Sequence, residues 1–210
     1  MSDAISKDKP IIIESSKLIL CEGEDECDIL TLFRTEQKKS KIDIEIISAG
    51  GRDKIDNKLL DLRAGSGGPM IKSVYLMIDS EEDASATQKF AAGFVLKHQT
   101  ETLKIHVFQL PSATENGSIE TLIRQGIVET SIGYDCAMQW EKCVQSDAKT
   151  TFDLKAKLDK AWLQVWLTHR TKSTASRIGY AIKNNADLRK ELIPALQPIE
   201  QIFTQCLTKS

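Results

Sequence analysis

Two apolar stretches that end in acidic residues decide the fold of this chain: KLILCEG at residues 17–23 and VYLMIDS at residues 74–80. A short apolar run without polar alternation is typical of a strand that is buried on both faces of a sheet. Helices are expected after both runs, over 25–38 and over 84–99. Strands that alternate with helices indicate βαβ units, and therefore a parallel sheet.

Further elements fit the same alternation in the first half of the chain. Strands are expected at 43–48 and 104–110, with a helix at 53–63 between the second and third strands. After residue 119 the sequence favours helices only, over 152–168 and 187–207, the latter bent at Pro194 and Pro198. The prediction is an α/β fold, with a mostly parallel sheet of about four strands flanked by helices and a helical C-terminal extension. We expect an α/β domain over 15–130 and the extension over 131–210, packed together as one compact unit.

The composition excludes several classes of protein. The chain has 210 residues, of which 41% are hydrophobic and 28% charged, which is typical of a globular domain rather than a disordered one. It has no apolar run of the roughly 18 residues that a membrane helix needs, and its start lacks the apolar region of a signal peptide. Its five cysteines form no CxxC pair. We therefore expect a cytoplasmic protein with reduced thiols.

The charge is unevenly divided along the chain. Residues 1–150 carry 18 Lys and Arg against 25 Asp and Glu, and residues 151–210 carry 10 against 5, which adds to the net charge of −2. The two halves could simply neutralise each other within one fold. Alternatively, an acidic metal site could lie beside a basic surface for a polyanion.

Acidic residues cluster where the expected strands end. Glu22 and Asp79 each follow an apolar run directly, and Ser118 and Glu120 follow the fourth strand after a loop. In an open parallel sheet the carboxyl ends of the strands share one edge, which is where ligands bind. Carboxylates gathered there favour a hard cation, Mg²⁺ or Mn²⁺, over zinc. Helix capping or solvated charge is an equally good interpretation for four further acidic residues, Glu24, Asp25, Glu82 and Asp83.

These motifs, in this order, resemble those of the Toprim superfamily. LILCEGEDE at 18–26 resembles the first Toprim motif, and MIDSE at 77–81 resembles the second, a strand that ends in Asp-x-Asp. Ser118-Ile119-Glu120 is similar to the Ser-x-Glu element of the OLD-type branch (overcoming lysogenization defect), and a glycine pair at 50–51 sits where that branch often has one. The resemblance covers about residues 15–125 and is nearest to small stand-alone OLD-like Toprim proteins. It implies a Toprim-like, Rossmann-like fold.

The resemblance also implies a chemistry, Mg²⁺-dependent phosphodiester hydrolysis of nucleic acid by one or two metal ions. Carried over residue by residue, the catalytic set would be Glu22, Asp79, Glu81 and Glu120, and Lys54 is a candidate for stabilising transition-state charge. The metal ligands would be Glu22, Glu26, Asp79, Glu81, Ser118 and Glu120, with Asp25 and Asp83 as auxiliaries. Arg52 is a further candidate for contact with the substrate or for stabilising transition-state charge. Two departures from the family pattern are Asp79-x-Glu81, in place of Asp-x-Asp, and Glu26, in place of the Asp of primases and topoisomerases.

The basic tail is a candidate nucleic-acid surface. Its candidate residues are Lys155, Lys160, Arg170, Lys172 and Arg177. The helix that carries the first two also holds Trp162 and Trp166, which we expect to pack in the core. The expected partner is DNA or RNA, without a membrane. A separate ATPase chain is a further candidate partner, because GxxxxGK[ST] is absent from this sequence.

Two alternatives to a nuclease stay open. The first is a non-catalytic Toprim module that binds a metal and docks nucleic acid or a partner ATPase. The second is a small-molecule phosphotransferase or phosphatase, although Asp79-Ser80-Glu81 breaks the Asp-x-Asp pattern that phosphoaspartate enzymes need. A topoisomerase is a poor match, because its tyrosine nucleophile sits on a separate domain.

Overall fold

The computed structural model describes residues 11–36, 43–146, 155–170 and 177–208. It contains four strands, eight α-helices and two short 3₁₀ helices within those ranges. In chain order they are β1 (Lys17–Cys21), α1 (Glu24–Glu36), β2 (Glu45–Ser48), η1 (Arg52–Lys54), α2 (Ile55–Ala64), η2 (Gly68–Met70), β3 (Ser73–Asp79), α3 (Ala84–His98), β4 (Lys104–Leu110), α4 (Ile119–Gln125), α5 (Tyr134–Ser146), α6 (Lys155–Thr168), α7 (Ile178–Asn184) and α8 (Ala186–Thr208).

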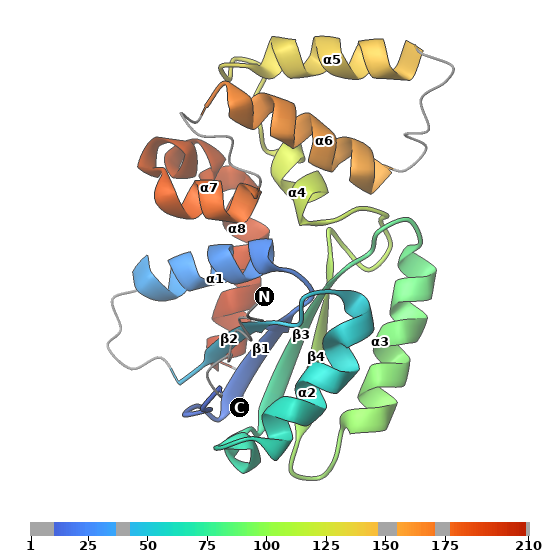
Figure 1. The fold of residues 1–210 in the computed structure, drawn as a ribbon, viewed down its shortest axis with the longest axis vertical. Coiled ribbons are helices and arrows are strands. Elements are labelled where there is room, and N and C mark those ends of the chain that lie inside the picture. Colours follow the sequence, from blue (N-terminus) through green and yellow to red (C-terminus); the bar gives the residue numbers. More distant parts are fainter. Residues whose placement is uncertain (1–10, 37–42, 147–154, 171–176, 209–210) are drawn as a thin grey trace, which may run out of the picture.

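The four strands form one parallel sheet in the order β2-β1-β3-β4. The chain passes from β1 to β2 on one side and then crosses to β3 on the other side of β1. The strand order therefore reverses between β1 and β3. Cys21 pairs with Met77 at the carboxyl end of this central pair. Ligands of open α/β sheets bind at such a reversal point, beyond the carboxyl ends of the strands. In Figure 1 the helices α4, α5 and α6 lie beyond that edge.

Each face of the sheet has its own hydrophobic core, as the two-residue period of a strand dictates. Ile19, Cys21, Tyr75 and Met77 face one core, to which α1, α4, α6, α7 and α8 contribute. The alternate residues, Leu18, Leu20, Val74, Leu76 and Ile78, face a second core with α2 and α3. Because every residue of β3 is buried, this strand has no polar alternation.

Helices from the end of the chain complete the first core. Trp162 and Trp166 are fully buried there, which confirms that they are packing residues. The last helix, α8, ends beside the start of β1, where Lys17 Nζ donates to the carbonyl oxygens of Cys206 and Leu207 at 3.2 and 2.8 Å. A cation at this position satisfies carbonyls that the end of a helix leaves unpaired. The first strand and the last helix are therefore tied together.

The α/β prediction is confirmed, with all four strands at the expected places and only helices after β4 in the described part of the chain. Tyr134 begins α5, a helix that was not predicted from the sequence. This helix buries only Ala137 and Glu141, so its apolar signal is weak. Pro194 and Pro198 both lie inside α8. The boundary between domains near residue 130 stays a prediction.

In the parts of the chain that the structure describes, no helix combines the length and the apolar character needed to cross a membrane.

Gly126 and Gly93 offer a matched test of the packing between α4 and α8. A Cβ added at Gly126 would lie 2.2 Å from the Cβ of Ala195 on α8, whereas one at Gly93, inside α3, would meet nothing within 4 Å. We predict that Gly126→Ala lowers the free energy of unfolding by about 1–3 kcal/mol through overpacking. Gly93→Ala should instead raise it by about 0.5–1 kcal/mol, because alanine favours the helix.

Urea denaturation followed by circular dichroism measures both changes. Equal stability of the Gly126→Ala protein and the parent would show that α8 does not pack closely on α4.

Candidate metal and phosphodiester site

A pocket of about 400 Å³ lies at the carboxyl ends of β1 and β3. Seven carboxylates and two cations line it, together with backbone from the glycine pair and Ile119. The carboxylates are Glu22, Glu24, Asp25, Glu26, Asp79, Glu81 and Glu120, and the cations are Lys160 and Arg177. The structure therefore brings the acidic residues of all three sequence motifs to one place.

The backbone of Glu22 is held from both sides. Its N–H donates to Met77 O at 2.9 Å, which extends the β1–β3 pairing by one residue. Its carbonyl accepts from Gly51 N at 2.9 Å. Gly50 and Gly51 have φ values of 77° and 132°, in a backbone region that residues other than glycine rarely adopt. The glycine pair thus closes the loop tightly over the end of β1 and fixes where the Glu22 side chain starts.

Arg52 is the basic partner of Glu22. Its Nη2 lies 3.3 Å from Glu22 Oε2 and also bonds to the carbonyl of Asp79, while its Nη1 donates to Thr87 Oγ1 at 3.1 Å. Thr87 was not among the residues predicted from the sequence. These contacts hold the Arg52 guanidinium within the site rather than at an open surface. We therefore expect Arg52 to orient Glu22 in the free protein.

Asp79 ends β3 and meets the start of α4. It is 8% exposed, and its Oδ1 accepts from Ile119 N at 3.1 Å. Ser118 and Thr121 begin α4 in a capping-box arrangement, in which Thr121 Oγ1 accepts from Ser118 N at 3.1 Å. The contact of Ser118 Oγ with the Thr121 amide falls short of hydrogen-bond geometry, which leaves this buried hydroxyl without a hydrogen bond.

Glu81 enters the pocket from a strained loop. Its φ of 52° is in the left-handed region, which costs a residue with a side chain about 1–2 kcal/mol. Two backbone hydrogen bonds with Gly117, of 2.6 and 2.7 Å, hold it there. The bridge ties the loop after β3 to the loop before α4. The same loop therefore positions Glu81 near Ser118 and Glu120.

Burial and mutual repulsion raise the pKa values of carboxyl groups in the pocket. Glu26 is 2% exposed, and burial, together with the charges of Glu120, Asp25 and Glu22, raises its pKa to about 8. Burial also raises the pKa of Asp79 well above its usual range, with Glu26 and Glu120 contributing, and it raises the pKa of Glu81. Shifts of this direction arise where negative charges gather without enough positive charge.

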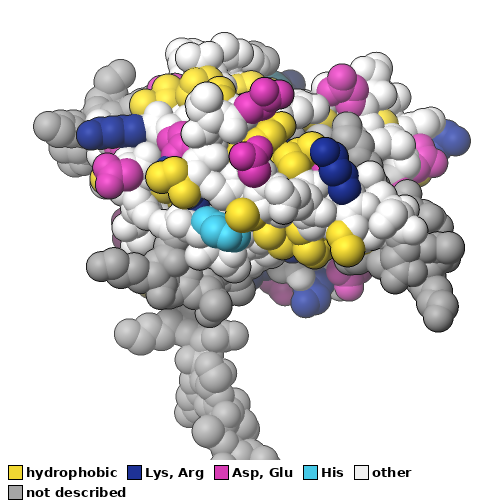
Figure 2. All heavy atoms as spheres, turned by 90° about the horizontal axis from the view of Figure 1, so that it is seen from above, with side chains coloured by type: hydrophobic (Ala, Val, Ile, Leu, Met, Phe, Trp, Pro, Cys, Tyr) yellow, Lys and Arg dark blue, Asp and Glu magenta, His cyan; other side chains and the backbone are white. Residues whose placement is uncertain are grey.

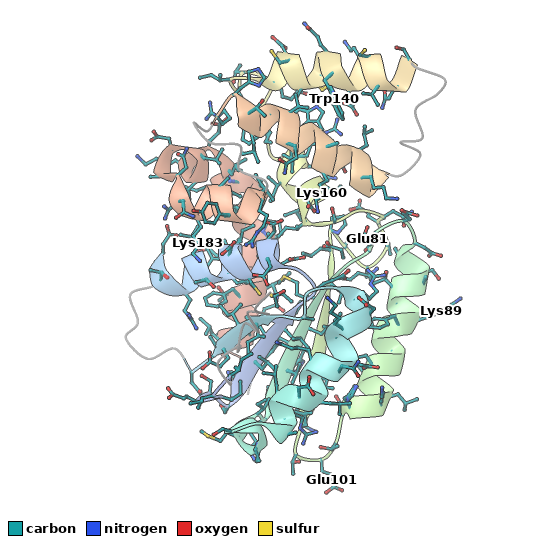
Figure 3. All side chains as sticks on the ribbon, viewed as in Figure 1. Glu81, Lys89, Glu101, Trp140, Lys160 and Lys183 are labelled. Carbon is teal, nitrogen blue, oxygen red and sulfur yellow. The ribbon has the colours of Figure 1, made fainter. Side chains whose placement is uncertain are left out.

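The C-terminal helices supply the two cations. Lys160 Nζ on α6 lies 3.5 Å from Glu120 Oε1, and the charge of Glu120 raises the lysine pKa. Figure 3 shows Lys160 on the side of α6 that faces the strand-end loops. Arg177, just before α7, lies 3.7 Å from Asp25 Oδ1 and pairs with Asp28. Gly179 N donates to Asp25 Oδ1 at 2.8 Å, a bond that opposes the effect of burial on the pKa of Asp25, which is nevertheless raised.

Other residues predicted for the site lie elsewhere. Lys54 is exposed on η1 and does not line the pocket. Asp83 caps α3, where its Oδ1 accepts from Ala86 N at 2.9 Å. Arg170 pairs with Glu191 and lies 5.6 Å from the centre of the Trp166 ring. Lys172 and the side chain of Lys155 lie outside the described residues.

The basic side chains that the structure describes on the helical end do not form a continuous stripe. Figure 2, which looks onto this end, shows the described Lys and Arg side chains at separate points among acidic and hydrophobic ones. Among the described basic residues of the tail, Lys160 and Arg177 line the acidic pocket, and Lys183 joins Arg177 at Asp28. The sequence identified Lys160 and Arg177 as basic, but only the fold turns them toward the carboxylates.

The oxygen atoms of the acidic pocket are of the type that binds a hard cation, but those that the structure describes are not already arranged around one point. They are carboxylate oxygens, which Mg²⁺ and Mn²⁺ prefer. The Ser118 hydroxyl, a predicted ligand, is buried without a hydrogen bond but does not line the pocket. Within residues 11–36, 43–146, 155–170 and 177–208, however, no three His, Cys, Asp or Glu side chains converge closely enough to hold an ion. Ion binding would therefore require carboxylates to rotate toward one point.

The raised pKa of Glu26 predicts how the metal-free protein responds to pH. Between the ordinary value of 4.5 and about 8, the unfolded chain has lost this proton while the folded protein keeps it. Rising pH therefore favours unfolding, by at most about 1.4 kcal/mol per pH unit for this group. Glu26→Gln is neutral at every pH. It should raise the free energy of unfolding in EDTA at about pH 8 and change it little at about pH 5.

Denaturant titrations at the two pH values measure this difference. Glu24→Gln is the matched control, because Glu24 lies in the same helical turn but is exposed. A Glu26→Gln protein that is less stable than the parent at about pH 8 would show that the ionised carboxylate stabilises the fold.

Comparison with known proteins places the chain in a family. Its distant structural neighbours are crystals of the C-terminal region of the Xanthomonas campestris pv. campestris OLD protein. The iodine-phased crystal has 17% identity and a TM-score of 0.35 over 93% of this chain and 85% of that one. The mercury-phased crystal has 16% identity and the same TM-score over 93% and 86%. No curated protein sequence matches. A family model described as "Protein of unknown function (DUF3226)" matches residues 16–209, so the chain belongs to that family.

Proposed function

We propose that this protein hydrolyses phosphodiester bonds of nucleic acid at the acidic pocket, with Mg²⁺ or Mn²⁺. The observation that carries the proposal is the convergence of Glu22, Glu26, Asp79, Glu81 and Glu120 in one pocket where burial and mutual repulsion raise carboxyl pKa values. Such a site gains stability when a divalent cation neutralises it. The resemblance of the sequence motifs to the Toprim superfamily supports the same chemistry.

The roles of the chain's own residues are those that the resemblance implies. Glu22, Asp79 and Glu81 would hold one metal ion, and Glu26, Glu120 and the Ser118 hydroxyl would help to hold a second, with Asp25 at the margin. A bound metal would supply an activated water and neutralise the leaving oxygen. Arg52 donates to both the Glu22 carboxylate and the Asp79 backbone carbonyl, and so holds them close to each other.

Lys160 takes the part that the sequence analysis gave to Lys54. It lines the pocket, whereas Lys54 does not. Its ammonium is paired to Glu120 at 3.5 Å in the free protein. With Glu120 engaged as a metal ligand, this ammonium would be available to the phosphate of the substrate. A positive charge aimed at the phosphate stabilises the charge that develops in the transition state.

A non-catalytic metal-binding module is the second candidate. The observation that favours it is that the carboxylates do not converge on a ready-made ion site in the described residues. In addition, Arg52, Lys160 and Arg177 already pair with several of them. Such a module would bind a metal and a nucleic acid, or a partner ATPase, without cutting. Cleavage assays separate the two candidates.

Glu22→Gln and Asp79→Asn test the nuclease proposal. Each keeps the size of the side chain and removes its charge, so we expect cleavage of labelled DNA or RNA in Mg²⁺ or Mn²⁺ to fall by at least about 100-fold. Glu82→Gln is the control, because Glu82 adjoins Glu81 but is exposed and does not line the pocket. EDTA should abolish cleavage by the parent protein.

Unchanged melting curves of the two variants would assign the loss to chemistry rather than to folding. Metal-dependent cleavage that survives in both variants would place the activity elsewhere in the preparation. If the parent cleaves no substrate but binds Mg²⁺ by calorimetry, the non-catalytic candidate is favoured.

Lys160→Gln tests the assignment of the pocket's cation. We expect cleavage to fall by about 10- to 1,000-fold, since one preorganised charge contributes on that scale. Lys157→Gln is the matched control, because Lys157 is exposed on the same helix, as Lys160 is, but does not line the pocket. Equal rates for the Lys160→Gln protein and the parent would contradict the role.

A further inference from the structure

A second pocket of about 440 Å³ lies between α4, α5 and α6, beside the acidic pocket. Glu120 and Lys160 line the acidic pocket, and their chain neighbours Thr121 and Asp159 line the second one. Because consecutive Cα atoms are about 3.8 Å apart, the two pockets are neighbours, and α4 and α6 contribute to both.

Arg124 organises the second pocket. Its Nη1 donates to Asp159 Oδ1 at 2.7 Å, and its Nη2 donates to Glu141 Oε2 at 2.6 Å. Its guanidinium carbon lies 4.8 Å from the centre of the Trp162 ring. One cation thus serves two carboxylates, and the group retains a net negative charge. Neither Arg124 nor its two carboxylate partners was a candidate in the sequence analysis.

Two buried polar atoms, on residues that line this pocket, have no hydrogen bond. They are Asp159 Oδ2, on a residue 3% exposed, and Trp162 Nε1, on a residue 0% exposed. Both residues line the pocket. They are three positions apart on α6 and therefore lie on one side of the helix. Buried polar atoms are rarely left unpaired in folded proteins, so this acceptor and this donor point to a ligand that pairs with both.

We propose that the second pocket receives a nucleobase of the strand whose phosphate lies in the acidic pocket. The Watson–Crick edge of every nucleobase carries an N–H donor beside an oxygen or nitrogen acceptor, which suits Asp159 Oδ2 and Trp162 Nε1. Tyr134, Ile127 and Leu158 offer the flat base an apolar surface. The choice of a nucleic acid as the ligand rests on the proposed function. The arrangement of the pocket does not.

Binding of short single-stranded oligonucleotides in EDTA tests the proposal without cleavage. Fluorescence anisotropy would compare end-labelled oligonucleotides of each base with an abasic oligonucleotide of equal length, which keeps the phosphates. We expect at least one intact oligonucleotide to bind about tenfold more tightly than the abasic one. Equal affinity of all the oligonucleotides, or binding of none, would overturn the proposal and leave the two buried atoms to ordered water.

Three variants locate the effect. Trp162→Phe removes the Nε1 donor and keeps the ring, and Asp159→Asn replaces an acceptor by a donor while Oδ1 still meets Arg124. Each should bring the affinity for the intact oligonucleotide to within about twofold of the abasic value. Trp166→Phe is the matched control, because Trp166 Nε1 donates to Ser131 Oγ at 3.0 Å, and this residue does not line the pocket. Base-dependent binding that persists in a folded Trp162→Phe protein would overturn the proposal.

The two proposals fail separately. Metal-dependent cleavage without base-dependent binding would overturn the second pocket and keep the nuclease. Base-dependent binding in EDTA, with no cleavage of any substrate in Mg²⁺ or Mn²⁺, would overturn the nuclease and keep the pocket.

Discussion

The parallel pairing of β1 with β3 is the constraint on which the site depends. Both strands are buried on both faces, so they cannot slide or separate without exposing the two cores. Their register sets Cys21 beside Met77, and the pairing continues through Glu22 N to Met77 O. Glu22 and Asp79, which are 57 positions apart in the chain, are thereby fixed at one edge of the sheet. The core thus enforces a repulsion between carboxylates that an open loop would relax.

Three cations offset that repulsion in the free protein, and each comes from a different part of the chain. Arg52 follows β2, Lys160 lies on α6 and Arg177 precedes α7. Each pairs with its own carboxylate, yet burial still raises the pKa values of Glu26, Asp79 and Glu81. The C-terminal helices therefore do more than cover a face of the sheet. They bring positive charge to the edge where the strands end, and one of them, α6, contributes to both pockets.

A close approach of backbones keeps these helices in place. Gly179 on α7 has no room for a Cβ, which would lie 2.4 Å from the carbonyl oxygen of Asp25, and Gly126 is equally crowded by Ala195 of α8. Glycine at both positions lets α7 approach α1 and α8 approach α4. Because Asp25 both accepts from Gly179 N and lines the acidic pocket, the packing of α7 is coupled to the geometry of the site.

The sequence alone determined the strands, the parallel sheet and most of the acidic set, because apolar runs and strand-end carboxylates are local patterns. It did not predict α5, whose exposed helix buries little, nor the network that joins Arg124 to Glu141 and Asp159 across three helices. It named Lys54 and Arg52 as cations for the site, of which Arg52 pairs with Glu22 and Lys54 does not line the pocket. Only the tertiary structure decided which basic side chains reach the carboxylates, because contacts between distant helices depend on packing rather than on spacing along the chain.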